Sequence, residues 1–239
     1  MKCFFALSLA ILAAGCTQKP TIEFTGITPG INDGEFIIKN ISDSTICKTA
    51  IKSGTFTVSS EYNNGTYGYM SVNNDKLGML AFDVYLQPGK YTVTFDRDKP
   101  YKYPDIQSTV KKQNELTAYY HLFDKTKDEL SKKAADLNAQ LKDPKSQMLP
   151  ADAYNNLVNK YKEAEQQQLK LATIVLSAFV DKYPDNSITP RIIVLNNAYM
   201  SNPDSYYRIF QKLSSAAKES PEGKAAKGLL ERANNLTNK

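Results

Sequence analysis

The stretch KKQNELTAYYHLFDKTKDELSKKAADLNAQL, residues 111–141, decides the fold, because the spacing of apolar residues changes there. Before this stretch they recur at every second position, as in a strand, and within it they recur at every third or fourth position, as in a helix. Its apolar residues recur on one side of a helical wheel, at Leu116, Tyr119, Tyr120, Phe123, Leu130, Ala134, Leu137 and Leu141. This spacing, which skips one position near Lys127, predicts an amphipathic helix of about 28 residues. Asp143-Pro144 ends the helix, since a proline disfavours helical geometry in the residue before it.

The chain after this helix is predicted to be helical as well. A second long helix begins near residues 150–152 and ends at Tyr183-Pro184, with QQQ, residues 166–168, on its exposed face. Because a short loop containing a proline joins the two long helices, we expect an antiparallel helix hairpin. Three shorter helices follow, each with a proline near its start: Thr189-Pro190 to Met200, one after Asn202-Pro203-Asp204, and Ser220-Pro221-Glu222 to about Leu236.

The chain before residue 111 has the pattern of strands. Residues 22–27, IEFTGI, alternate between apolar and polar side chains, and so do residues 55–59, TFTVS. Asn63-Asn64-Gly65 predicts a hairpin turn, because Asn and Gly tolerate the positive φ angles that such a turn requires. Strands separated by turns without helical patterns predict an antiparallel β-sandwich or open barrel over residues 21–110. With a helical domain over residues 111–239, the predicted fold class is α+β.

The first twenty residues predict an exported and lipid-anchored protein. Lys2 precedes an apolar run of about ten residues, CFFALSLAIL at 3–12, which is too short to span a bilayer and indicates a signal peptide over residues 1–15. The following AAGC, residues 13–16, resembles the lipobox of bacterial lipoproteins. That resemblance implies acyl chains on Cys16, an acylated tether over residues 16–20 and, with Thr17 after the cysteine, the outer membrane facing the periplasm. The alternative is ordinary secretory cleavage, with Cys16 as an incidental thiol.

Composition excludes several classes of function. The 239 residues carry a net charge of +5. Residues 21–110 hold 8 Lys and Arg against 10 Asp and Glu, residues 111–239 hold 20 against 15, and Lys2 and Lys19 supply the remaining two positive charges. This charge is too dilute for a nucleic-acid binder and is typical of a solvated helical surface. Three cysteines and one histidine are too few for a disulfide scaffold or a His-rich metal centre. We therefore expect neither a metal nor another cofactor.

Several segments together resemble one known module. They are Gly26 after an apolar strand, KSGTF at 52–56, YLQPGKY at 85–91, FVDKYPDNS at 179–187 and SPEGK at 220–224. Residues 21–236 are similar to the N-terminal domain of unknown function (number 4369) and the helical segment of exported Bacteroidetes thiol-disulfide oxidoreductases. In that family a thioredoxin domain follows, whose Cys-x-x-Cys motif performs the redox chemistry. This sequence has no Cys-x-x-Cys, so no catalytic residue is implied for it.

The sequence offers few candidate site residues besides Cys16. Tyr62, Tyr67 and Tyr69, with Tyr101 and Tyr103, are candidates for an aromatic platform that binds a sugar or a peptide; the alternative is packing within the β domain. Three further features have structural interpretations: Cys47 as a small strand residue or else a reactive thiol, His121 as a packed or surface histidine, and the acidic pairs Asp96/Asp98 and Asp128/Glu129 as surface charges.

These features predict a non-enzymatic lipoprotein of the periplasm that acts as a binding or accessory module of the cell envelope. Its expected partners are the membrane, through the lipid on Cys16, and an envelope protein, but not nucleic acid. One alternative is a partner in trans of a separate thioredoxin-like thiol-disulfide oxidoreductase. Another is a helical envelope scaffold, although no repeat of the usual helical-pair length is visible in the sequence.

Overall fold

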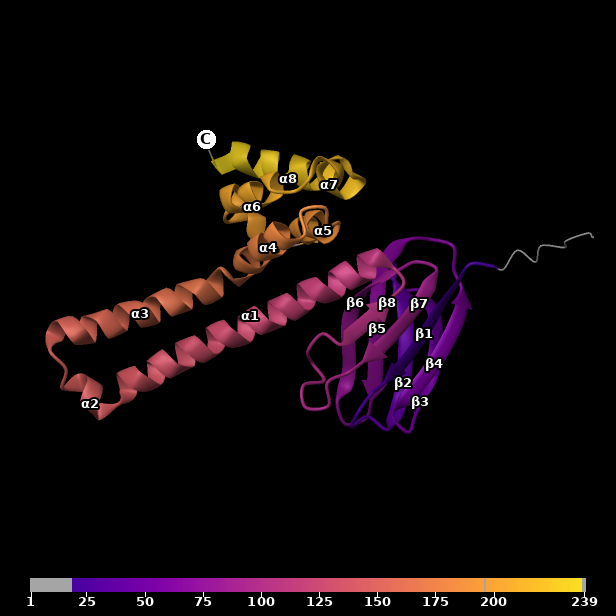
Figure 1. Cartoon of the computed structure of the whole chain (residues 1–239), viewed down its shortest axis with the longest axis horizontal. Helices are drawn as coiled ribbons and strands as arrows, with labels where there is room; N and C mark the ends of the chain where they lie inside the picture. The colour runs from indigo at the N-terminus through magenta and orange to yellow at the C-terminus, as the bar shows by residue number, and fades with distance from the viewer. Residues whose placement is uncertain (1–18, 196, 238–239) are drawn as a thin grey trace, which may run out of the picture.

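The computed structural model describes residues 19–195 and 197–237, and these have an α+β fold in which a curled sheet precedes the helices (Figure 1). The strands are β1 (Thr21–Ile27), β2 (Asp33–Asn40), β3 (Thr45–Lys52), β4 (Thr55–Glu61), β5 (Thr66–Asn74), β6 (Gly78–Leu86), β7 (Gly89–Thr94) and β8 (Asp105–Ser108). The helices are α1 (Lys111–Lys142), α2 (Pro144–Gln147), α3 (Ala151–Leu169), α4 (Leu171–Lys182), α5 (Ile188–Leu195), η1 (Asn197–Met200), α6 (Pro203–Gln211), α7 (Ser215–Glu219) and α8 (Pro221–Thr237). The predicted signal peptide and Cys16 lie outside the described residues.

The strands form one sheet in the order β6-β5-β2-β3-β4-β1-β7-β8, which curls into a half-barrel. The predicted α+β class is confirmed, and of the two predicted β architectures the structure has the open barrel. All neighbouring strands run antiparallel except β1 and β7, which pair in parallel from Ile22 opposite Gly89 to Ile27 opposite Thr94. The sheet is therefore mixed.

The hairpin predicted at Asn63-Asn64-Gly65 is wrong. The strands on either side of it are not neighbours, since β4 pairs with β1 and β3, whereas β5 pairs with β2 and β6. None of the three residues has the positive φ that a two-residue hairpin needs. The tight hairpin forms instead at Ser53-Gly54, where φ is 49° and 74° and where Lys52 lies opposite Thr55.

Aromatic rings fill the concave side of the sheet. Phe24 stacks on Tyr91 with ring centroids 4.4 Å apart, and Phe36 stacks on Phe56 at 3.9 Å. Gly26 permits this packing, because a Cβ there would overlap the Phe56 ring and lie 2.8 Å from the carbonyl oxygen of Val93.

The N-terminal half of α1 covers both open edges of the half-barrel. Gln113, with no exposed surface, accepts a hydrogen bond from the backbone N–H of Tyr85 in β6 at 2.8 Å. It also donates to the Tyr103 hydroxyl and to Thr117, each at 3.1 Å. Thr117 in turn donates to the carbonyl oxygen of Ile106 in β8 at 3.1 Å. These side chains satisfy edge groups that a closed barrel would pair by strand-to-strand hydrogen bonds.

The helices form two parts (Figure 1). The arm consists of the C-terminal half of α1 with α2 and α3, and the compact helical body consists of α4 to α8. α1 is 32 residues long, somewhat longer than predicted, and its C-terminal half forms the predicted antiparallel hairpin with α3. The single long helix predicted to run to Tyr183 is wrong, because it breaks at Lys170 into α3 and α4. Within the described residues, no helix is both long and apolar enough to cross a membrane.

The helical body packs on the sheet through α1. Leu116 and Tyr119 of α1 are buried, and Tyr119 meets Phe179 of α4 edge to face with centroids 5.5 Å apart. One hydrophobic core therefore runs from the sheet into the helices α4 to α8. The arm lies beyond this core, and the buried apolar residues between its two helices are Ala134 and Ala164.

Candidate functional site

An aromatic cavity of about 380 Å³ lies where the edge strand β6, the loop before β8 and α1 meet. We call it the aromatic cavity. Its lining residues come from three places in the chain: Tyr69, Ala81, Phe82 and Asp83 from β5 and β6, Tyr101 and Tyr103 from the loop, and Tyr120, Phe123 and Asp124 from α1.

Regular structure positions most of these side chains. Tyr69 and Asp83 are direct partners across β5 and β6, so their side chains lie on the same face of the sheet. Tyr120, Phe123 and Asp124 are spaced three and four residues apart and therefore share one face of α1. The side chains from β5, β6 and α1 are therefore placed by regular secondary structure and not by a loop.

The loop that carries Tyr101 is held by a turn at its start. The carboxylate of Asp96 accepts hydrogen bonds from the backbone N–H groups of Asp98 and Lys99, at 2.9 and 3.2 Å. The backbone N–H of Lys102 then donates to the carbonyl oxygen of Lys99 at 3.0 Å. Asp96, which belongs to the acidic pair Asp96/Asp98 noted in the sequence, thus shapes the loop. Tyr101 projects from this loop and is 69% exposed.

The inner wall of the aromatic cavity is a stack of rings around Tyr103. This ring lies parallel to that of Tyr120, with centroids 4.5 Å apart, and meets Phe82 edge to face at 6.0 Å. The Tyr103 hydroxyl donates to the backbone carbonyl oxygen of Asp83 at 2.7 Å. The wall is therefore fixed in place, whereas Tyr69 and Tyr101, 43% and 69% exposed, stand at the mouth.

Two carboxylates supply the charge of the cavity, and each is held by one hydrogen bond. The Tyr120 hydroxyl donates to one oxygen of Asp83, and the backbone N–H of Tyr103 donates to one oxygen of Asp124 at 3.0 Å. Burial, and next the negative charge of Asp83, raises the pKa of Tyr120 well above its usual value. Burial also raises the pKa of Tyr103. Both hydroxyls therefore remain neutral donors at physiological pH.

The nearest lysine of the loop is engaged outside the aromatic cavity. Lys102 forms an ion pair with Asp128 in a neighbouring cavity, which also contains His121 and Lys125. The hydrogen bond with Asp128 raises the pKa of Lys102 and lowers the pKa of Asp128. The described lining of the aromatic cavity contains Asp83 and Asp124 as its ionisable carboxylates and no lysine, arginine or histidine.

The three tyrosines singled out in the sequence lie in three different places. Tyr69 lines the aromatic cavity together with Tyr101 and Tyr103. Tyr67 is buried beneath Arg191 of α5, whose guanidinium carbon lies 3.5 Å from the centre of the ring. Tyr62 lines a separate cavity of about 410 Å³ at the start of β1.

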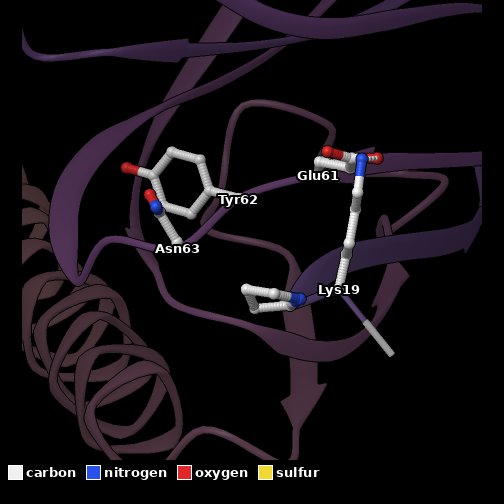
Figure 2. Close-up of a pocket in the computed structure, with 5 residues that line it drawn as sticks. Lys19, Glu61, Tyr62 and Asn63 are labelled. Carbon is white, nitrogen blue, oxygen red and sulfur yellow. Dashed lines mark hydrogen bonds and ion pairs between the residues drawn. The ribbon is translucent and has the colours of Figure 1, made fainter. Parts of the chain in front are cut away.

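The cavity beside Tyr62 is where the described chain enters the sheet, and Figure 2 shows its lining. The Lys19 ammonium pairs with the Glu61 carboxylate at 2.7 Å, but both side chains are largely exposed, so this pair contributes little stability. The backbone N–H of Tyr62 donates to the carbonyl oxygen of Pro20 at 2.9 Å. These contacts fasten the start of β1.

The other candidate residues have structural surroundings. Cys47 is half-buried in β3, and burial raises the pKa of its thiol to about 11, which disfavours the nucleophilic thiolate. The ring of His121 is exposed, and its Nε2 lies 3.3 Å from the carbonyl oxygen of Pro104. In the described part of the chain, no three His, Cys, Asp or Glu side chains form a group that could hold a metal ion.

Sequence analysis singled out Tyr69, Tyr101 and Tyr103 but missed the other six of the nine residues that line the aromatic cavity. Tyr120 and Phe123 belong to the predicted apolar stripe of the helix, and no sequence pattern distinguishes Asp83 or Asp124 from the other acidic residues. The spacing of Tyr120, Phe123 and Asp124 was a usable signal, because an acid beside two aromatic residues on one helical face interrupts an apolar stripe. Nothing local in the sequence places that face against Asp83.

No protein-family model matches the chain, and a search of curated proteins finds no match either. The resemblance to the N-terminal module of thiol-disulfide oxidoreductases therefore stays a prediction.

Proposed function

We propose that the protein is a non-enzymatic, lipid-anchored binding module of the bacterial cell envelope that holds its ligand in the aromatic cavity. The observation that carries the proposal is the combination of a rigid ring wall, two oriented carboxylates and two exposed tyrosines around one concave site. Ligand sites in proteins are typically such clefts, mainly apolar and with a few fixed polar groups that set orientation.

The proposed anchor is Cys16, joined to acyl chains in the outer membrane. Residues 16–20 can span at most about 17 Å when fully extended, so the sheet would stand close to the membrane surface. β1 begins on the side of the sheet that faces away from the arm (Figure 1). In this arrangement the arm would project away from the anchor.

Thermal denaturation of the full chain, with a panel of amines, sugars and short peptides, tests the binding function. A ligand at 100 times its dissociation constant stabilises the folded state by about 2.7 kcal/mol, which corresponds to roughly 5–10 °C in the melting temperature. We expect Tyr101→Ala to abolish the shift. Tyr154→Ala, on α3 in the arm, should leave it unchanged. If no panel member shifts the wild type, or if both variants respond equally, the aromatic cavity is not the ligand site.

Labelling of cells with a radioactive or alkyne-bearing fatty acid tests the anchor separately. We expect the wild-type chain to be labelled and to sediment with membranes, whereas Cys16→Ser should be unlabelled and released. Labelling that survives in Cys16→Ser would contradict the proposed attachment site.

A further inference from the structure

We propose that the aromatic cavity selects a small organic cation, an alkylammonium group whose charge is held by Asp83 and Asp124 and whose carbon atoms lie against the tyrosine rings. This inference rests on the proposed function, that the cavity holds a ligand, and it names the chemical class of that ligand. The charge of the lining, the geometry of its carboxylates and the exposure of its rings each support it.

The first step is charge complementarity. The described lining contains two carboxylates and no basic side chain, and its buried tyrosines remain neutral. Asp124 also lines the neighbouring cavity, and its charge adds to the hydrogen bond from Asp128 in raising the pKa of Lys102. The ammonium of Lys102 is nevertheless paired with Asp128, and Lys125 lies 3.9 Å from Glu129. A cationic ligand would provide the positive charge that the lining lacks, whereas an anion would be repelled.

The second step is the state of the two carboxylates. Each has one oxygen fixed by a tyrosine, either the Tyr120 hydroxyl or the backbone N–H of Tyr103. The other oxygen of Asp83 and of Asp124 accepts no hydrogen bond from any described residue. Both side chains are partly buried, where charge interactions are less screened than in water. Two oriented acceptors with spare capacity suit a donor-rich or fully charged head group.

The third step is the ring surface. Tyr69 and Tyr101 stand exposed at the mouth, and Tyr120 and Phe123 line the wall. The face of an aromatic ring carries partial negative charge and attracts cations, most effectively where water is excluded. A volume of about 380 Å³ accommodates one such head group with a short substituent. A neutral sugar could stack on the same rings, but it would leave Asp83 without a counter-charge.

Isothermal titration of the full chain in detergent with a charged and a neutral isostere tests the inference. Choline and 3,3-dimethylbutan-1-ol have nearly the same shape and differ in the charge on the quaternary centre. We expect choline to bind at least tenfold more tightly. A second pair, Nα-acetyl-lysine methylamide and its norleucine counterpart, tells whether a lysine side chain is also accepted. A tenfold preference for the charged member of either pair supports the proposal.

Variants then assign the preference to the cavity. Asp83→Asn keeps an oxygen that can accept the Tyr120 hydrogen bond, and Asp124→Asn keeps one for Tyr103, so both variants preserve the local geometry. We expect each to reduce the affinity for choline about tenfold while leaving the affinity for the neutral isostere unchanged. Asp75→Asn, which removes an exposed carboxylate in the turn before β6 that lines neither this cavity nor the neighbouring one, is the matched control and should bind choline like the wild type. A loss in Asp75→Asn equal to that in Asp83→Asn would refute the assignment.

The outcomes separate this inference from the proposed function. Equal binding of choline and its neutral isostere, or tighter binding of a sugar that Tyr101→Ala abolishes, would overturn cation selectivity and leave a binding module. Failure of every charged and neutral compound to bind would overturn both.

Discussion

Replacement of Gln113 by leucine tests whether α1 holds the half-barrel closed. The side chain has no exposed surface and makes three hydrogen bonds, one of which satisfies the backbone N–H of Tyr85 in β6. Leucine has a similar volume but no polar atoms, so this N–H would stay buried without a partner, at a cost of about 1–3 kcal/mol. Loss of the bonds to Tyr103 and Thr117 adds roughly 1 kcal/mol each. We expect the free energy of unfolding to fall by about 3–5 kcal/mol.

Equilibrium unfolding in urea measures this change, with the helical content followed by circular dichroism. Gln107→Leu is the matched control, because Gln107 lies on β8, is exposed and makes only a 3.3 Å side-chain contact with Asp105 among the described residues. The control should change the free energy of unfolding by less than about 0.5 kcal/mol. In Gln113→Leu we also expect faster hydrogen exchange at the Tyr85 amide. A loss below about 1 kcal/mol, with Tyr85 still protected, would refute the role assigned to Gln113.

Three further predictions follow from packing and burial. Gly26→Ala should lower the free energy of unfolding by at least about 2 kcal/mol, because the new Cβ would overlap the aromatic core. Gly228→Ala, in an open helical position, should raise the free energy of unfolding by about 0.5–1 kcal/mol, and urea unfolding of both variants measures the difference. Burial raises the pKa of Tyr91 to about 12, above the value near 10 that the residue has in the unfolded chain. The stabilising contribution of Tyr91 is therefore complete below pH 10 and is lost as the pH rises to 12. Melting temperatures measured from about pH 8 to 12 should first stay constant and then fall. The pKa of about 11 for Cys47 predicts alkylation about 100-fold slower at pH 8 in the folded than in the urea-unfolded protein, as measured by mass spectrometry; equal rates would contradict its burial.

The sequence predicted local structure well because period and turn chemistry are local properties. Ile22 and Phe24 alternate with polar neighbours and are fully buried in β1. The prolines that follow Asn202 and Ser220 are the first residues of α6 and α8, as predicted. Strand pairing was another matter. Asn63-Asn64-Gly65 lies between β4 and β5, but β5 forms its hydrogen-bonded ladders with β2 and β6. Which strands pair is decided by how their buried faces join in one core, which depends on residues far apart in the sequence.

The same limit explains the break at Lys170. The apolar stripes on either side of it are both helical, and the residue itself is a good helix former, so local pattern favours one continuous helix. In the structure the two segments have different neighbours: α3 packs on α1 in the arm, while α4 also packs on the helical body. The break lies where the packing partner changes, which no single-segment pattern records.

The aromatic cavity exists because the sheet stops short of closing. The open edges of β6 and β8 carry backbone groups that need partners, and α1 and the loop before β8 supply side chains to them. Tyr103 belongs to both arrangements, since its hydroxyl accepts from Gln113 and donates to the backbone oxygen of Asp83, while its ring forms the cavity wall. The bonds that stabilise the closure therefore also fix the ring against which a ligand would lie. A site formed by the fold's own closure needs no dedicated motif, which explains why its residues are scattered over three distant segments of the sequence.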